Sequence, residues 1–127
     1  MHPAAADMSY ISASVLYQDR YLYLAFNDER LYRIYDIADP ASPVQIFESG
    51  EILNICDLVI SGDRMYISGF EANGSPAAFQ EWDISDQFHP TLSAAGTNPL
   101  NISRLSVTDE YVFGLDRMYG LHIYQKN

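Results

Sequence analysis

The chain carries little positive charge, a single cysteine and no long apolar run. Only 7 of its 127 residues are Lys or Arg, against 17 Asp or Glu, which gives a formal net charge of −10. A chain this acidic repels phosphate backbones and anionic lipid headgroups, so we expect neither nucleic acid nor a membrane among its partners. No apolar stretch in the sequence approaches the roughly 20 residues that cross a bilayer as a helix.

The sequence also lacks the residues that metal sites, cofactor sites and disulfides need. Cys56 has no second cysteine to pair with, and its place in the apolar run 52–60 predicts a small buried core residue. The histidines His2, His89 and His122 are too scattered for two of them to share one face, so we expect no metal. No phosphate loop, nucleophile elbow or other catalytic signature is present, and we expect no cofactor. The first ten residues lack the basic and apolar segments of a signal peptide.

Short alternating runs of β-branched and aromatic residues fill the chain. Hydrophobic residues make up 48% of the sequence, enough for a packed core, and 10 tyrosines and 6 phenylalanines favour strands. Turn residues separate the runs every eight to twelve positions or so, as in all-β chains, and no helical periodicity competes with them. The clearest runs are 21–26, 31–37, 65–70 and 111–115.

The same pattern occurs three times. A first block has two apolar positions, a polar turn and an alternating strand that ends in an aromatic residue. Its copies are 15–23, 58–66 and 105–113. A second strand-like block follows each of them at 32–37, 79–84 and 121–125. In the middle copy, extra residues around 71–76 predict a longer hairpin tip.

The first two copies then continue alike. Asp36 and Asp39 in one copy, and Asp83 and Asp86 in the other, precede a proline and a further short strand. Such carboxylates accept hydrogen bonds from backbone N–H groups two or three residues on, which predicts a tight turn at each place. Each repeat thus contains four short strands in about 40–47 residues, which is typical of a β-propeller blade.

The segment 35–43 (YDIADPASP) resembles the LVIVD-repeat family of bacterial and archaeal β-propellers, whose repeat closes approximately on Ile-Val-Asp-Val-Ser-Asp-Pro-x-x-Pro. The later copies depart from that motif. Gln125 replaces its first Asp in the third copy, while Glu81 replaces its Ile and Gln87 its first Pro in the second. The resemblance implies a β-propeller scaffold of unassigned activity at the cell surface or otherwise outside the cytoplasm. An ordinary β-sandwich with accidental self-similarity is the alternative.

The strand pattern predicts three blades and an incomplete ring. We expect an orphan outer strand at about 3–9, blade 1 at about 11–50, blade 2 at about 55–96, and blade 3, without its outer strand, at about 102–125. Natural rings start at about four blades. We therefore expect either a head-to-tail dimer of six blades, in which the N-terminal strand completes the partner's last blade, or a longer propeller of which this chain is one part.

Three polar residues occupy equivalent positions at the start of the first strand of each blade. They are Ser14, Asp57 and Arg104. In a propeller such positions face the central channel, where they predict either a polar site for a small ligand or ion, or an ion pair between Asp57 and Arg104 that fixes the packing of two blades.

Glu81 places a carboxylate where the other copies have Ile34 and Ile123. A buried, unpaired glutamate is a candidate acid, whereas one beside Arg64 or Arg104 is structural. We expect a non-catalytic interaction module that binds a protein, peptide or glycan. The alternative is part of a propeller hydrolase that acts on glycans or esters through Asp57 and Glu81, which requires these carboxylates to lie close together.

Overall fold

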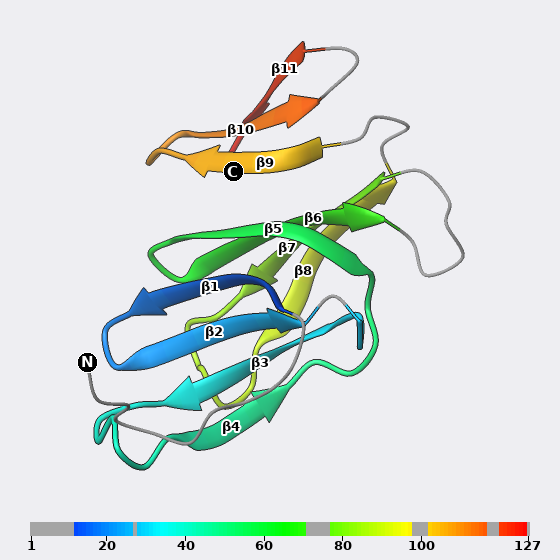
Figure 1. The fold of residues 1–127 in the computed structure, drawn as a ribbon. Coiled ribbons are helices and arrows are strands. Elements are labelled where there is room, and N and C mark those ends of the chain that lie inside the picture. Colours follow the sequence, from blue (N-terminus) through cyan, green and yellow to red (C-terminus); the bar gives the residue numbers. More distant parts are fainter. Residues whose placement is uncertain (1–11, 27, 71–76, 98–101, 117–119, 127) are drawn as a thin grey trace, which may run out of the picture.

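The computed structural model describes residues 12–26, 28–70, 77–97, 102–116 and 120–126. These ranges contain eleven strands and no helix, arranged in three antiparallel sheets (Figure 1). The prediction of an all-β chain is confirmed. The expected outer strand at 3–9 and the expected hairpin tip at 71–76 lie outside the described residues.

Each sheet is a meander in which strands adjacent in sequence are hydrogen-bonded neighbours. The first sheet contains β1 (Ser12–Gln18), β2 (Tyr21–Phe26), β3 (Leu31–Asp36) and β4 (Val44–Glu48). The second contains β5 (Asn54–Ser61), β6 (Arg64–Phe70), β7 (Ala77–Asp83) and β8 (Thr91–Thr97). The third contains β9 (Ile102–Val107), β10 (Tyr111–Asp116) and β11 (Gly120–Gln125).

The three sheets repeat the same register. In each of them, an aromatic residue on the second strand pairs with the same position of the third strand. Glu81 occupies that position in the second sheet. The pairs are Tyr23–Ile34, Tyr66–Glu81 and Phe113–Ile123. The first strand of each sheet also carries an irregularity at the same place, between Ser12 and Ser14 and between Ile55 and Asp57 in the first two. The sequence alignment of the three copies is therefore confirmed residue by residue.

Cys56 lies at the second of these irregularities and is half-buried, so the prediction of a buried core cysteine is wrong. A β-bulge turns the extra residue out of the regular alternation of faces. The alternation of apolar residues along the run 52–60 therefore gives no guide to the exposure of this one position.

The predicted turn chemistry is present in both complete sheets. Asp36 accepts a hydrogen bond from the Ala38 N–H at 2.9 Å, and Asp83 accepts one from the Ser85 N–H at 2.9 Å. An ion pair with Arg20 helps to hold the pKa of the Asp36 carboxyl below its usual range. These bonds fix the chain where it leaves the third strand of each sheet, and so set the path to the fourth strand.

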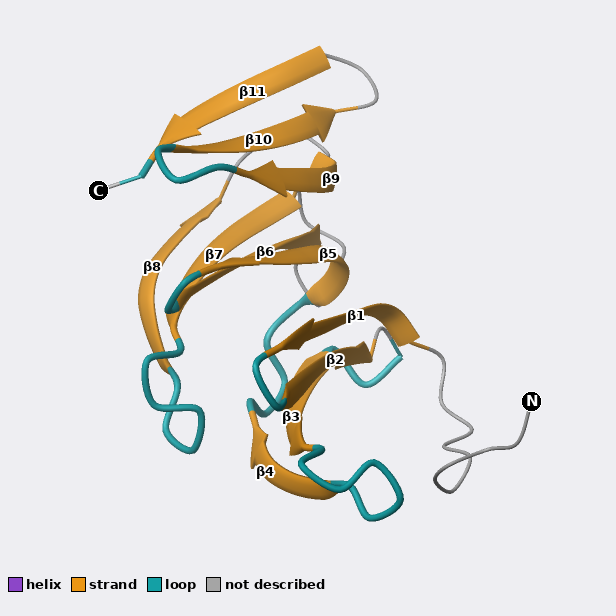
Figure 2. Cartoon of the chain, turned by 90° about the vertical axis from the view of Figure 1, so that its left-hand side faces the viewer, coloured by secondary structure: helices purple, strands orange, loops and turns teal. Residues whose placement is uncertain are grey.

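The sheets stack face to face, with β1, β5 and β9 as neighbours at one side of the stack (Figure 2). One buried cluster fills the space between the first and second sheets, and a smaller one fills the space between the second and third. Tyr32 contributes to the larger cluster, where its ring meets Trp82 edge-on at a centroid distance of 5.2 Å. The core therefore has one layer at each junction between neighbouring sheets, and a third cluster, made of Leu24, Phe26 and Leu31, lies on the other face of the first sheet.

Candidate functional site

The polar residues at the start of the first strands occupy matched positions in the three sheets. Ser14 pairs with Ala25, Asp57 with Ser68 and Arg104 with Leu115. The side chain of Ser14 lies outside the described part of the structure. Asp57 is half-buried and Arg104 is exposed.

Asp57 links the second sheet to the third. One oxygen of its carboxylate, Oδ2, accepts a hydrogen bond from the backbone N–H of Leu105 at 2.8 Å, and Oδ1 accepts one from Leu58 at 3.0 Å. The described residues show no ion pair between Asp57 and Arg104. Asp57 does link these two strands, but through the backbone amide of Leu105 and not through the guanidinium group that the sequence suggested.

Replacing Asp57 with alanine removes the acceptor of the Leu105 N–H and leaves that donor at a half-buried position. We expect the variant to lose about 1 kcal/mol of stability and its Leu105 amide to exchange faster with solvent, since an unsatisfied donor costs roughly 1–3 kcal/mol when buried. Hydrogen exchange measured by NMR and urea unfolding test this. Asp57→Asn, which keeps one acceptor oxygen, is the matched control, and unchanged exchange of Leu105 in the alanine variant would contradict the assignment.

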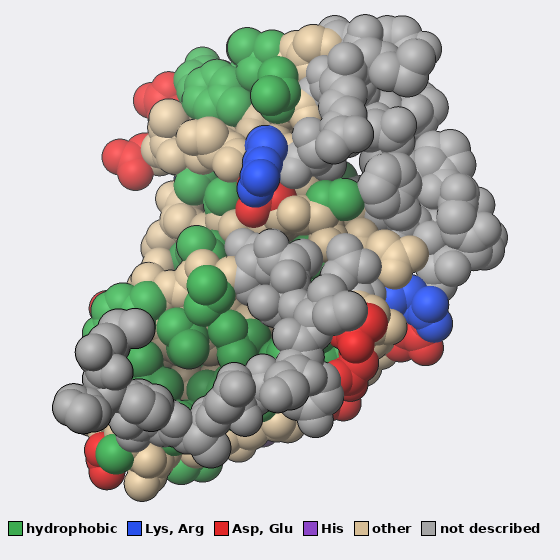
Figure 3. All heavy atoms as spheres, viewed as in Figure 1, with side chains coloured by type: hydrophobic (Ala, Val, Ile, Leu, Met, Phe, Trp, Pro, Cys, Tyr) green, Lys and Arg blue, Asp and Glu red, His purple; other side chains and the backbone are tan. Residues whose placement is uncertain are grey.

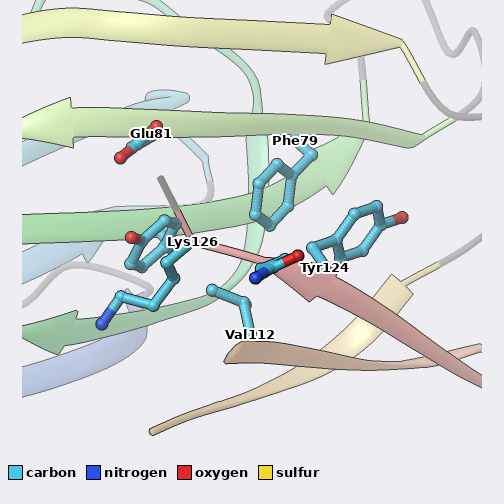
Figure 4. Close-up of a pocket in the computed structure, with 7 residues that line it drawn as sticks. Phe79, Glu81, Val112, Tyr124 and Lys126 are labelled. Carbon is cyan, nitrogen blue, oxygen red and sulfur yellow. The ribbon is translucent and has the colours of Figure 1, made fainter. Parts of the chain in front are cut away.

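A cavity of about 170 Å³ opens between the second and third sheets. Its lining includes Glu81, and the labelled side chains come from β7, β10, β11 and the end of the chain (Figure 4). The rings of Phe79 and Tyr124 are stacked at a centroid distance of 5.1 Å. The lining residues are Tyr66, Phe79, Glu81, Val112, Tyr124, Gln125 and Lys126.

Glu81 shares its ion-pair partner, Arg64, with a second carboxylate. Glu81 lies 3.8 Å from the Nε atom of Arg64, and that arginine also reaches Asp83 at 3.1 Å. Of the two arginines that the sequence suggested, Arg64 is therefore the one beside Glu81. Burial raises the pKa of the neighbouring Tyr66 hydroxyl, and the negative charge of Glu81 adds to that increase.

Lys126 closes one side of the cavity. Its ammonium group donates to Ser61 Oγ at 2.8 Å and to the Thr108 carbonyl at 2.9 Å, on the side away from Glu81 (Figure 4). The position of Lys126 is occupied by isoleucine in the other two sheets. Each copy has an equivalent backbone hydrogen bond at this position. Its donors are the N–H groups of Ile37, Ile84 and Lys126, so these three residues are equivalent. Lys126 was not predicted from the sequence, although its departure from the repeat marks it as clearly as Glu81.

Replacing Glu81 with glutamine removes a negative charge beside Tyr66. We expect the pKa of Tyr66 to fall, yet to stay above that of an exposed tyrosine, because burial is the larger cause of its rise. A ¹³C NMR titration of the tyrosine ring carbons measures the change. Glu51→Gln, at an exposed carboxylate outside the cavity, is the control. A Tyr66 pKa that stays the same or rises in Glu81→Gln would contradict the geometry.

Asp57 and Glu81 come from two strands that are not neighbours in the second sheet. They project from the same face of the second sheet, but β6 lies between them and they differ by two residues along the strands. This arrangement separates their Cα atoms by about 12 Å. Asp57 is also occupied by two backbone donors. Within the described ranges, no three His, Cys, Asp or Glu side chains are placed to hold a metal ion.

Comparison with known proteins gives a likeness in fold and none in sequence. No family model and no curated protein match the chain. A putative 6-phosphogluconolactonase from Bacteroides fragilis NCTC 9343 matches 91% of the chain with a TM-score of 0.78 and 12% identity. The computationally designed Ika4 protein matches 91% with a TM-score of 0.69 and 12% identity.

The chain spans 35% of the Bacteroides fragilis protein and 66% of the designed one, less than two thirds of each. At 12% identity the likeness concerns the fold alone. The described residues include no helix long and apolar enough to cross a bilayer.

Proposed function

We propose that the chain forms three blades of a β-propeller, related to the LVIVD-repeat proteins, that acts as a non-catalytic interaction module for a protein, peptide or glycan. The repeated register of the three sheets and their face-to-face stacking support the propeller. The likeness to two longer chains supports an array that continues beyond three sheets. A location outside the cytoplasm belongs to the same proposal.

The cavity between the second and third sheets is the observation that carries the binding role. Stacked aromatic rings beside a carboxylate offer an apolar wall and a hydrogen-bond acceptor at one place. Its volume of about 170 Å³ is smaller than the roughly 300–1,000 Å³ of typical small-molecule sites. A cavity of this size accepts one side chain or one sugar ring of a larger partner.

Arrays of peptides and glycans test the binding role directly. We expect the purified chain to bind a subset of these probes, and binding to fall at least tenfold in Tyr124→Ala, which removes one of the stacked rings. Phe88→Ala, at an exposed loop position, is the control and should bind as the wild type does. If Tyr124→Ala binds every probe that the wild type binds, and equally well, the cavity is not the binding site.

A hydrolase that acts on glycans or esters is the second candidate, because one similar structure bears the name of a lactonase. The two backbone hydrogen bonds that the Asp57 carboxylate accepts weigh against it. We expect no turnover of 6-phosphogluconolactone or p-nitrophenyl acetate above the buffer rate. Turnover that is abolished in Glu81→Gln would favour the hydrolase over the binding module.

A further inference from the structure

Both junctions in the stack use the same pairs of positions. We call the leading face of a sheet the side that packs on the next sheet, and the trailing face the side that receives the preceding one. The first leading face carries the cross-strand pairs Tyr23–Ile34 and Ala25–Tyr32, and all four residues are buried against the second sheet. The second leading face carries the equivalent pairs Tyr66–Glu81 and Ser68–Phe79.

The trailing faces match in the same way. The second sheet offers Leu58 and the pair Met65–Trp82 to the first sheet. The third sheet offers Leu105 and the pair Val112–Tyr124 to the second. A leading face therefore packs on a trailing face at two places in this chain, although the side chains differ between the two junctions. The fit depends on the shared register and the apolar character of the faces.

The third leading face presents the same positions to solvent. It carries the pairs Phe113–Ile123 and Leu115–Leu121, with Leu121 60% exposed and Ile123 57% exposed. Hydrophobic side chains gather over this sheet at the top of the molecule (Figure 3). In the first sheet, the equivalent side chains Tyr23, Ile34 and Tyr32 are fully buried. Among the described residues, no sheet packs on this face.

The trailing face of the first sheet, at the opposite end of the stack, is exposed along β1. Val15 is 56% exposed and Tyr17 64% exposed, whereas Leu24, Phe26 and Leu31 on the same face are buried. Val15 is the equivalent of Leu58 and Leu105, which are buried at the two internal junctions. Exposed apolar faces of this kind mark protein interaction sites. The exposed positions at the two end faces thus correspond to the two halves of a junction that the chain already forms twice.

We propose that the leading face of the third sheet binds the trailing face of the first sheet of a second copy of this chain. A head-to-tail contact of this type closes when two copies form it reciprocally, which here gives six sheets around a two-fold axis. The inference rests on the proposed propeller but not on the proposed ligand. It gives the oligomeric state and the residues that determine it.

The junction between copies differs from the internal ones in one polar contact. At the junction of the second and third sheets, Asp57 accepts from the Leu105 N–H. The equivalent residue on the third leading face is Arg104, which has no acceptor for such an amide. The contact between copies therefore depends on apolar burial, and one carboxylate placed in it should break it.

Analytical ultracentrifugation of complementary variants tests the proposal. We expect the wild type to sediment with twice its chain mass of 14.4 kDa. Ile123→Glu on the leading face and Val15→Glu on the trailing face should each sediment as a folded monomer, with the β-sheet circular dichroism of the wild type. Phe88→Glu changes an exposed loop side chain in the same way and should stay dimeric. Leu121→Lys is a second leading-face variant of opposite charge.

A mixture of the two glutamate variants distinguishes a head-to-tail contact from a symmetric one. Each variant retains the face that the other has lost, so the mixture should contain dimers at high protein concentration. A mixture that stays monomeric, or a folded monomeric wild type, would overturn the proposal. A monomer that still binds its array probes would overturn this inference alone, while a dimer without probe binding would overturn only the binding role.

Discussion

Replacing Tyr32 with alanine is expected to lower the free energy of unfolding by about 3–5 kcal/mol, the range found for large buried aromatic side chains. Its ring is fully buried between the first two sheets, against Trp82 and against Phe47 at a centroid distance of 5.6 Å. Removing the ring leaves a cavity at the centre of the larger core layer, because both neighbouring rings lie in sheets whose register fixes their positions. Urea unfolding followed by circular dichroism measures the loss.

Tyr32→Phe is the matched control for this prediction. The Tyr32 hydroxyl has no hydrogen-bond partner among the described residues, and burial raises the pKa of the group far above its usual range. Removing an unsatisfied buried hydroxyl should therefore leave stability unchanged or raise it slightly. A phenylalanine variant that loses as much stability as the alanine variant would show that the hydroxyl, and not the packing of the ring, accounts for the effect.

Replacing Gly69 with alanine is the second change with a large expected effect. A Cβ atom at this position would overlap the backbone carbonyl oxygen of Asn54 and the side chain of Leu53. Leu53 is fully buried and leads into β5, so the strand itself would have to move. We expect a loss of about 3 kcal/mol, the upper part of the range for overpacked cores.

Gly62→Ala provides the comparison, because a Cβ atom there meets no other group. Its backbone φ is +59°, which costs a residue with a side chain about 1 kcal/mol. Asp19 holds the equivalent turn position at a φ of 60°, so the turn itself tolerates a side chain. Denaturant unfolding of the two variants should give the larger loss for Gly69→Ala. Equal losses would contradict the close approach of Asn54.

The repeat, the strands and the turns follow from the sequence, because each depends on residues close together in the chain. Alternation of apolar and polar positions determines which residues lie on one face, and Asp36 and Asp83 determine where the third strand ends. The same comparison of copies singled out Glu81 as the unusual member of its set. These properties need only the period of a strand and the hydrogen-bonding habit of a carboxylate.

Contacts between sheets could not be predicted in the same way. The sequence placed Asp57 and Arg104 at equivalent positions, but it could not show that the carboxylate reaches a backbone amide of the next sheet. The cavity arises where Glu81 and Lys126 approach one space from two different sheets, so neither alone predicts it. Cys56 shows a related limit, because a bulge changes its exposure without changing the apolar pattern around it.

A crystal structure of the purified chain would test most directly the claim that equivalent faces pack on one another throughout the assembly. The account predicts two copies around a two-fold axis, with Leu121 and Ile123 of each copy buried against the first sheet of its partner. Copies that meet through any other surface, with these two side chains in solvent, would contradict it.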